Sequence, residues 1–97
     1  SPIADIYLST ASLWEIAIKQ AKGKLEIAGD TMQTALESGL KIIDIKYDHI
    51  LGTQDLPHIH GDPFDRMLIS TARCERMKII TSDKIFMQYN VRVIEAV

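Results

Sequence analysis

Cysteine, long apolar runs and an excess of basic charge are scarce or absent in this sequence. Cys74 is the only cysteine, so no internal disulfide can form, and we interpret it as a small buried thiol. No apolar run approaches the roughly 20 residues that a membrane-spanning helix needs, and no basic-then-apolar signal peptide is visible. We therefore expect a cytoplasmic protein without a membrane partner.

The formal net charge is −2, which argues against a protein that holds nucleic acid by bulk positive charge. Any contact with RNA or DNA would have to be local, through a few basic side chains or a bound cation. A chain of 97 residues predicts a single domain over residues 1–97, near the size at which one core is self-sufficient.

Short runs of β-forming residues alternate with helical patterns along the chain. Strands are predicted around residues 6–9, 42–45, 78–81 and 91–94, and helices around 12–22, 30–38, 47–54, 62–77 and 85–89. This alternation predicts an α/β fold with a parallel sheet and helices on its faces. In such sheets the functional site lies beyond the carboxyl ends of the strands.

Three acidic residues follow predicted strands, and each has a structural explanation at a helix start. Glu15 completes a capping box that begins at Ser12, and Asp65 lies in the first turn of a helix capped by Asp62. Asp83 is placed to cap the helical turn after it. Taken singly, each acid is better explained as structural.

Taken together, the three acids indicate a functional site, because the carboxyl ends of parallel strands lie at one edge of the sheet and all three acids follow such ends. Carboxylates within a few ångströms of one another do not all stay ionised unless a cation lies among them. Clusters made only of carboxylates suit hard divalent ions such as Mg²⁺ or Mn²⁺. Asp65 also shares a helix face with apolar residues, which is unusual for an unpaired aspartate.

The histidines before Asp62, and Trp14, are interpreted as structural residues and not as parts of a functional site. His58, His60 and Asp62 have the H-x-H-x-D spacing of metallo-β-lactamase-fold hydrolases, but Pro63 stands where that motif needs a further histidine. The chain is also too short for that fold, so we interpret these histidines as loop residues. Trp14 is interpreted as a core residue at helical spacing.

Several stretches resemble, in order, the PIN-domain ribonucleases of the VapC toxin type: YLSTASLWEIAIK (7–19), DPFDRMLISTA (62–72) and IITSDKIFMQYNV (79–91). The resemblance spans almost the whole chain. It implies a three-layer α/β/α sandwich with a central parallel sheet, and an acidic pocket of four carboxylates that binds Mg²⁺ or Mn²⁺. It also implies endonucleolytic cleavage of RNA and inhibition by a cognate antitoxin protein.

Carried over by position, the family's second, third and fourth acids match, as catalytic and metal-binding residues, Glu15, Asp65 and Asp83. The resemblance further implies weaker, substrate-contacting roles for Arg66, Thr81 and Lys84. Nothing matches the family's first acid, since Asp5 precedes the strand that leads to Glu15. We therefore expect a partial PIN domain that lacks the family's first strand and helix.

Two consequences of that expected truncation follow. A vacant strand position would expose apolar surface, so we expect the chain to form a homo-oligomer that covers it. The alternative to a metal-dependent ribonuclease is a catalytically incomplete PIN-like fragment that acts as a protein-interaction module.

Overall fold

The computed structural model describes residues 6–24 and 31–95. The chain divides into two compact units between Asp44 and Ile45, and each unit is described by itself. The expected start of a helix at Asp30 lies outside the described residues.

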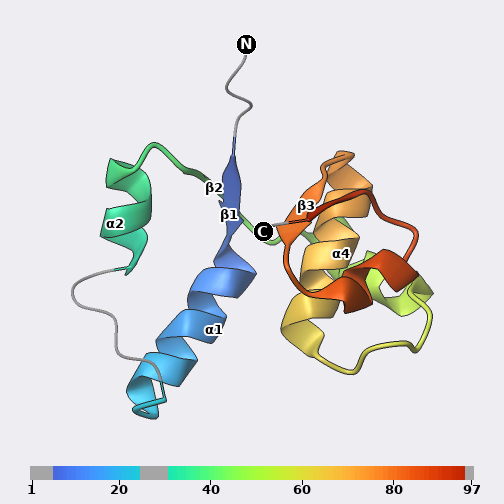
Figure 1. Cartoon of the computed structure of the whole chain (residues 1–97), viewed down its shortest axis with the longest axis horizontal. Coiled ribbons are helices and arrows are strands. Elements are labelled where there is room, and N and C mark those ends of the chain that lie inside the picture. The colour runs from blue at the N-terminus through green and yellow to red at the C-terminus, as the bar shows by residue number, and fades with distance from the viewer. Residues whose placement is uncertain (1–5, 25–30, 96–97) are drawn as a thin grey trace. The chain divides into compact units, whose positions relative to one another are not determined.

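The first unit is a strand–helix–helix–strand motif. It consists of β1 (Tyr7–Ser9), α1 (Thr10–Ala21), α2 (Thr31–Glu37) and β2 (Lys41–Ile43) (Figure 1). β1 and β2 pair in parallel, with Leu8 opposite Ile42. Gly23 and Gly39 follow the two helices with φ angles of 69° and 88°, which glycine adopts without a steric penalty. The predicted helices and parallel strands of this unit are confirmed.

The start of α1 differs from the prediction. Ser9, not Ser12, is the N-cap, and its Oγ accepts a hydrogen bond from the Ala11 backbone N–H at 3.0 Å. Ser9 is also the last residue of β1 and has extended backbone angles, so the strand passes into the helix without a loop. The capping-box explanation of Glu15 is therefore wrong, because Glu15 lies in the second turn of α1.

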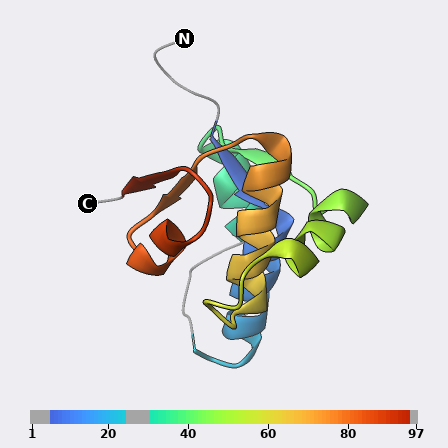
Figure 2. The same ribbon diagram turned by 90° about the vertical axis from the view of Figure 1, so that its right-hand side faces the viewer.

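The second unit is built around one long helix. Its elements in order are α3 (Tyr47–Gly52), the 3₁₀ helix η1 (Thr53–Asp55), α4 (Pro63–Glu75), β3 (Ile79–Thr81), the 3₁₀ helix η2 (Lys84–Gln88) and β4 (Val93–Glu95). α4 lies between α3 on one side and the β3–β4 pair with η2 on the other (Figure 2). Its core consists of Leu56, Ile69, Phe86 and Tyr89.

β3 and β4 also pair in parallel, with Ile80 opposite Ile94. The predicted α/β class with parallel strands is thus confirmed, with element ends shifted by a few residues. Among the described residues the four strands form two separate pairs. A single central sheet in a three-layer sandwich, and a single domain over the whole chain, stay predictions.

α3 is fixed against α4 at a glycine. A Cβ at Gly52 would collide with Ser70 Oγ, and that hydroxyl donates to the His49 carbonyl oxygen at 2.6 Å. His49 is fully buried, and its Nδ1 accepts the Lys46 backbone N–H at 3.1 Å. The contact of Gly52 and His49 with Ser70 holds α3 and η1 against α4. It thereby also holds the loop that leads into α4.

Two residues predicted to be buried are exposed. Trp14 is 62% exposed and shares a face of α1 with the exposed Ala17 and Ala21. The thiol of Cys74 is also exposed, near the Asp48 carbonyl oxygen at 3.7 Å. No helix in the described ranges is long and apolar enough to cross a membrane.

Candidate functional site

The beginning of α4 is capped by Asp62, as predicted. Asp62 Oδ1 accepts hydrogen bonds from the backbone N–H groups of Phe64 at 2.8 Å and Asp65 at 3.1 Å. Pro63 occupies the first helical position, where its missing N–H costs nothing. Because Asp62 satisfies the helix start, the carboxylate of Asp65 is not needed for capping.

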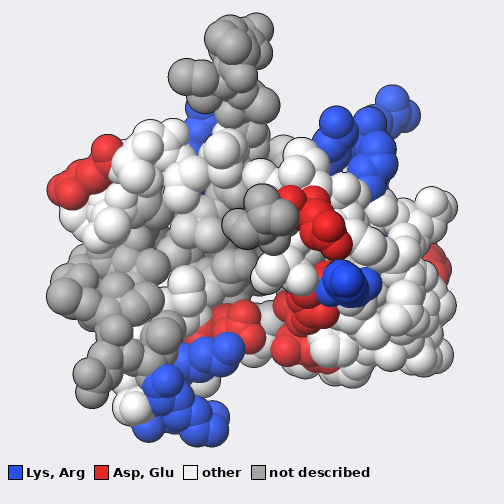
Figure 3. All heavy atoms as spheres, viewed as in Figure 1, with Lys and Arg blue, Asp and Glu red and all other residues white. Residues whose placement is uncertain are grey.

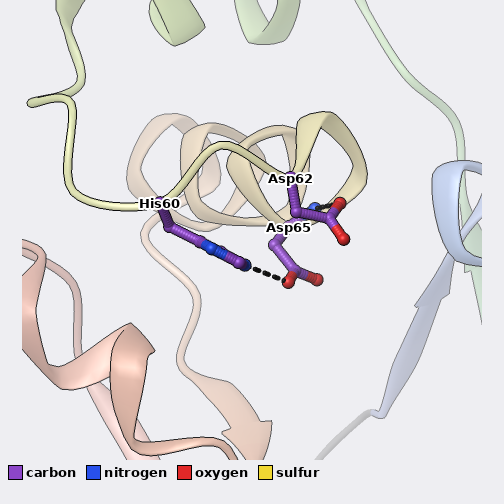
Figure 4. Close-up of side chains that lie close together, drawn as sticks. All are labelled: His60, Asp62 and Asp65. Carbon is purple, nitrogen blue, oxygen red and sulfur yellow. Dashed lines mark hydrogen bonds and ion pairs between the residues drawn. The ribbon is translucent and has the colours of Figure 1, made fainter.

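The Asp65 carboxylate contacts a histidine that precedes the helix. His60 Nε2 lies 2.7 Å from Asp65 Oδ2, and both side chains are partly buried. Figure 4 shows the Asp65 carboxylate between the imidazole of His60 and the carboxylate of Asp62. One ligand atom from each of the three residues lies within 4.8 Å of the others. His60 does lie in a loop, but its side chain belongs to this cluster, which the sequence analysis missed.

Asp83 lies two residues beyond the end of β3 in the same unit. β3 runs back along α4, so its carboxyl end points toward the beginning of that helix (Figure 1). Asp83 Oδ1 caps η2 by accepting the Ile85 N–H at 3.1 Å, as predicted, and the Asp83 N–H donates to Thr81 Oγ1 at 3.1 Å. Asp83 and Lys84 are both exposed. The Thr81 hydroxyl thus orients the backbone at Asp83.

A protein-family model described as the PIN domain matches residues 2–91 of the chain. The chain belongs to the PIN-domain family. The match covers both units, and the α/β fold of the family agrees with the parallel strand pairs described above. PIN domains are generally nucleases. No curated protein matches the sequence.

His60 is anchored in this PIN domain through its backbone as well as its side chain. Its N–H donates to the Tyr89 hydroxyl oxygen at 2.8 Å, and its carbonyl oxygen accepts from Arg66 Nη1 at 3.4 Å. Tyr89 is buried and follows η2, whereas Arg66 is on α4. Arg66 on the following helix and Tyr89, 29 residues later, therefore fix the residue that contacts Asp65.

Arg66 holds the whole loop before α4. Its two terminal nitrogens donate to four backbone carbonyl oxygens, at 3.0 Å from Thr53, 3.3 Å from Leu56, 2.9 Å from Pro57 and 3.4 Å from His60. This structural role was not foreseen from the sequence. Contact between Arg66 and RNA stays a prediction. These bonds involve both terminal nitrogens of the guanidinium group.

Glu15 lies on α1, in the first unit of the PIN domain. Its Oε2 lies 3.4 Å from Lys19 Nζ, one turn further along α1. Such a partly exposed i,i+4 pair contributes only a few tenths of a kcal/mol, roughly 0.3–0.5. Because Glu15 does not cap the helix, its carboxylate is available for another role. The meeting of Glu15 with Asp65 and Asp83 stays a prediction.

Proposed function

We propose that this PIN domain is a metal-dependent endoribonuclease, in which Asp65 is the central acid of the site. The observation that carries the proposal is the position of the Asp65 carboxylate. Asp62 caps the helix, so Asp65 is not needed for this. His60, whose backbone is held by Tyr89 and Arg66, contacts one oxygen of the Asp65 carboxylate. A carboxylate held in this way at the start of a helix is prepared to bind a ligand.

The donor atoms fit the divalent ion that the family implies. Among the described residues, one oxygen each of Asp65 and Asp83 makes no hydrogen bond, since His60 occupies only Oδ2 and Ile85 only Oδ1. Carboxylate oxygens are the ligands that Mg²⁺ and Mn²⁺ prefer. Asp65, Asp83 and Glu15 would hold the ion. When bound, such an ion activates water for attack on a phosphodiester.

The other residues of the site have supporting roles in the proposal. The exposed Lys84 ammonium, next to Asp83, would contact an RNA phosphate, and Thr81 would border the pocket. The role of toxin in a toxin–antitoxin pair, an antitoxin partner and self-association belong to the same proposal.

Metal-dependent cleavage of RNA is the experiment that tests this function. We expect internal cleavage of single-stranded and structured RNA in Mn²⁺ or Mg²⁺, followed on denaturing gels. EDTA should stop the reaction, and added metal should restore it. Intact RNA in both metals, from a folded chain, would contradict the nuclease function and support the interaction module instead.

His60→Ala is expected to weaken Mn²⁺ binding by about 10-fold, because a histidine that orients a metal-binding carboxylate supports the affinity of the site. Titration calorimetry measures the affinity without RNA. His58→Ala is the matched control, since His58 is exposed two residues earlier and outside the cluster. His60→Gln, which can keep an N–H donor, should restore part of the loss. Equal affinities for His60→Ala and His58→Ala would refute the role of His60.

A further inference from the structure

Three of the chain's four arginines line one cleft at the carboxyl-terminal end of α4. Arg73 belongs to the last turn of α4, Arg76 is its C-cap residue and Arg92 directly precedes β4. The cleft has a volume of about 450 Å³, and residues 89–91 after η2 line its other side. Figure 3 shows a group of basic side chains over this end of α4. In a chain of net charge −2, this concentration of positive charge is local.

None of the described residues that line the cleft has a carboxylate that would neutralise the arginines. Glu75 lies between two of them in sequence, but its oxygens lie 3.5 Å from Lys46 Nζ and 3.6 Å from His49 Nε2, so it serves the contact with α3. Among the described residues, Arg73, Arg76 and Arg92 form no ion pair, although Asp55 lines a neighbouring hollow that Arg73 also borders. Like charges around one space repel, and an anion bound among them relieves the repulsion.

The backbone at the cleft is held in a defined shape. Arg92 Nη2 donates to the Arg76 carbonyl oxygen at 3.3 Å, which connects the end of α4 to the residue before β4. Arg76 ends the helix in a left-handed conformation with φ 57°, and the Met77 N–H closes the turn on the Ala72 carbonyl oxygen at 2.8 Å. Arg76 therefore projects from a closed turn, and the hydrogen bond from Arg92 to its carbonyl oxygen connects the two residues.

Phosphate is an anion that this arrangement suits. Planar guanidinium groups donate pairs of hydrogen bonds to phosphate oxygens, whereas a lysine acts as a point charge. Asp65 and Arg76 are eleven residues apart along α4, which corresponds to about 16 Å at 1.5 Å per residue. A strand of RNA bound at Asp65 would reach the cleft within a few nucleotides.

Tyr89 joins the cleft to the site. It lines the cleft, and its hydroxyl group accepts the backbone N–H of His60 at 2.8 Å. We propose that Arg73, Arg76 and Arg92 bind backbone phosphates of the RNA, a few nucleotides from the bond cleaved at Asp65. This inference rests on the proposed function, because it takes the same RNA as the ligand.

Binding of RNA in EDTA tests the cleft without cleavage. The probe is a short fluorescent single-stranded RNA, and its anisotropy gives the affinity at several KCl concentrations. For the double variant Arg73→Gln/Arg92→Gln we expect the slope of log K against log salt to fall by about 1.4, since each phosphate contact on a single strand contributes about 0.7. Lys22→Gln/Lys24→Gln is the matched control, because it removes the same charge from exposed positions after α1.

The outcomes separate the cleft from the proposed catalysis. Equal slopes for the two double variants, both folded by thermal melting, would overturn the phosphate cleft even if the wild type cleaves RNA. A lowered slope only for the arginine variant supports the cleft even if no metal gives cleavage. Unchanged RNA binding with weakened binding of a polyglutamate peptide would assign the cleft to an acidic protein and overturn the RNA proposal.

Discussion

Asp65→Asn is expected to lower the rate of RNA cleavage by about 100- to 1,000-fold, the loss typical when a charge-stabilising group is removed from a catalytic site. Asparagine has nearly the same shape but lacks the negative charge and one of the two oxygens that hold a cation. Asp65 does not cap α4, so the unfolding free energy of the Asp65→Asn variant should differ little from that of the wild type. Initial rates from gels and thermal melting of the same samples measure both quantities.

Asp62→Asn is the matched control for this variant. It makes the same chemical change three residues earlier, and asparagine caps helices as well as aspartate does. We expect the cleavage rate and the melting temperature to stay near those of the wild type. An equal loss of activity in both variants would show that the charge of Asp62 also serves the reaction, and that the assignment of Asp65 as the central acid is wrong.

Arg66→Ala is expected to lower the unfolding free energy by about 3 kcal/mol. The change removes the donors of four backbone carbonyl oxygens between Thr53 and His60. Some of these carbonyls are near solvent and regain hydrogen bonds to water, so the loss is smaller than the sum of four bonds to a charged group. Urea unfolding followed by circular dichroism measures the change.

Two other variants show whether the guanidinium shape matters. Arg66→Lys should lose most of the same free energy, because one ammonium group cannot reach carbonyls on both sides of the loop. Arg73→Ala, on the same helix but exposed, should change the unfolding free energy by less than about 0.5 kcal/mol. Wild-type stability of Arg66→Ala combined with weaker RNA binding would instead support Arg66 as an RNA contact.

The residues that sequence reasoning placed correctly are those whose role is local. The Asp62 and Asp83 caps depend on backbone N–H groups two or three residues later, so the pattern of residues at the helix start is sufficient to predict them. The Lys19–Glu15 pair, one turn apart on α1, depends on local spacing in the same way.

The misplaced residues depend on contacts distant in sequence. Ser9 and Ser12 are both good N-caps, and the choice between them is set by where β1 ends, which depends on its pairing with β2 some thirty residues later. His60 reaches Asp65 because Tyr89 and Arg66 fix its backbone, and the H-x-H-x-D spacing carries no information about either. The arginine cleft likewise combines residues from α4 with one before β4.

The hydrogen bond from His60 to the Tyr89 hydroxyl couples the packing of the second unit to the orientation of Asp65. It spans 29 positions of the chain, so its loop-closure entropy is repaid only after α4, β3 and η2 have packed. The native position of the His60 loop therefore depends on the packed core of the second unit, and so does the contact of His60 with Asp65. A partly folded second unit would carry Asp65 at a normal helix start and yet have no oriented carboxylate.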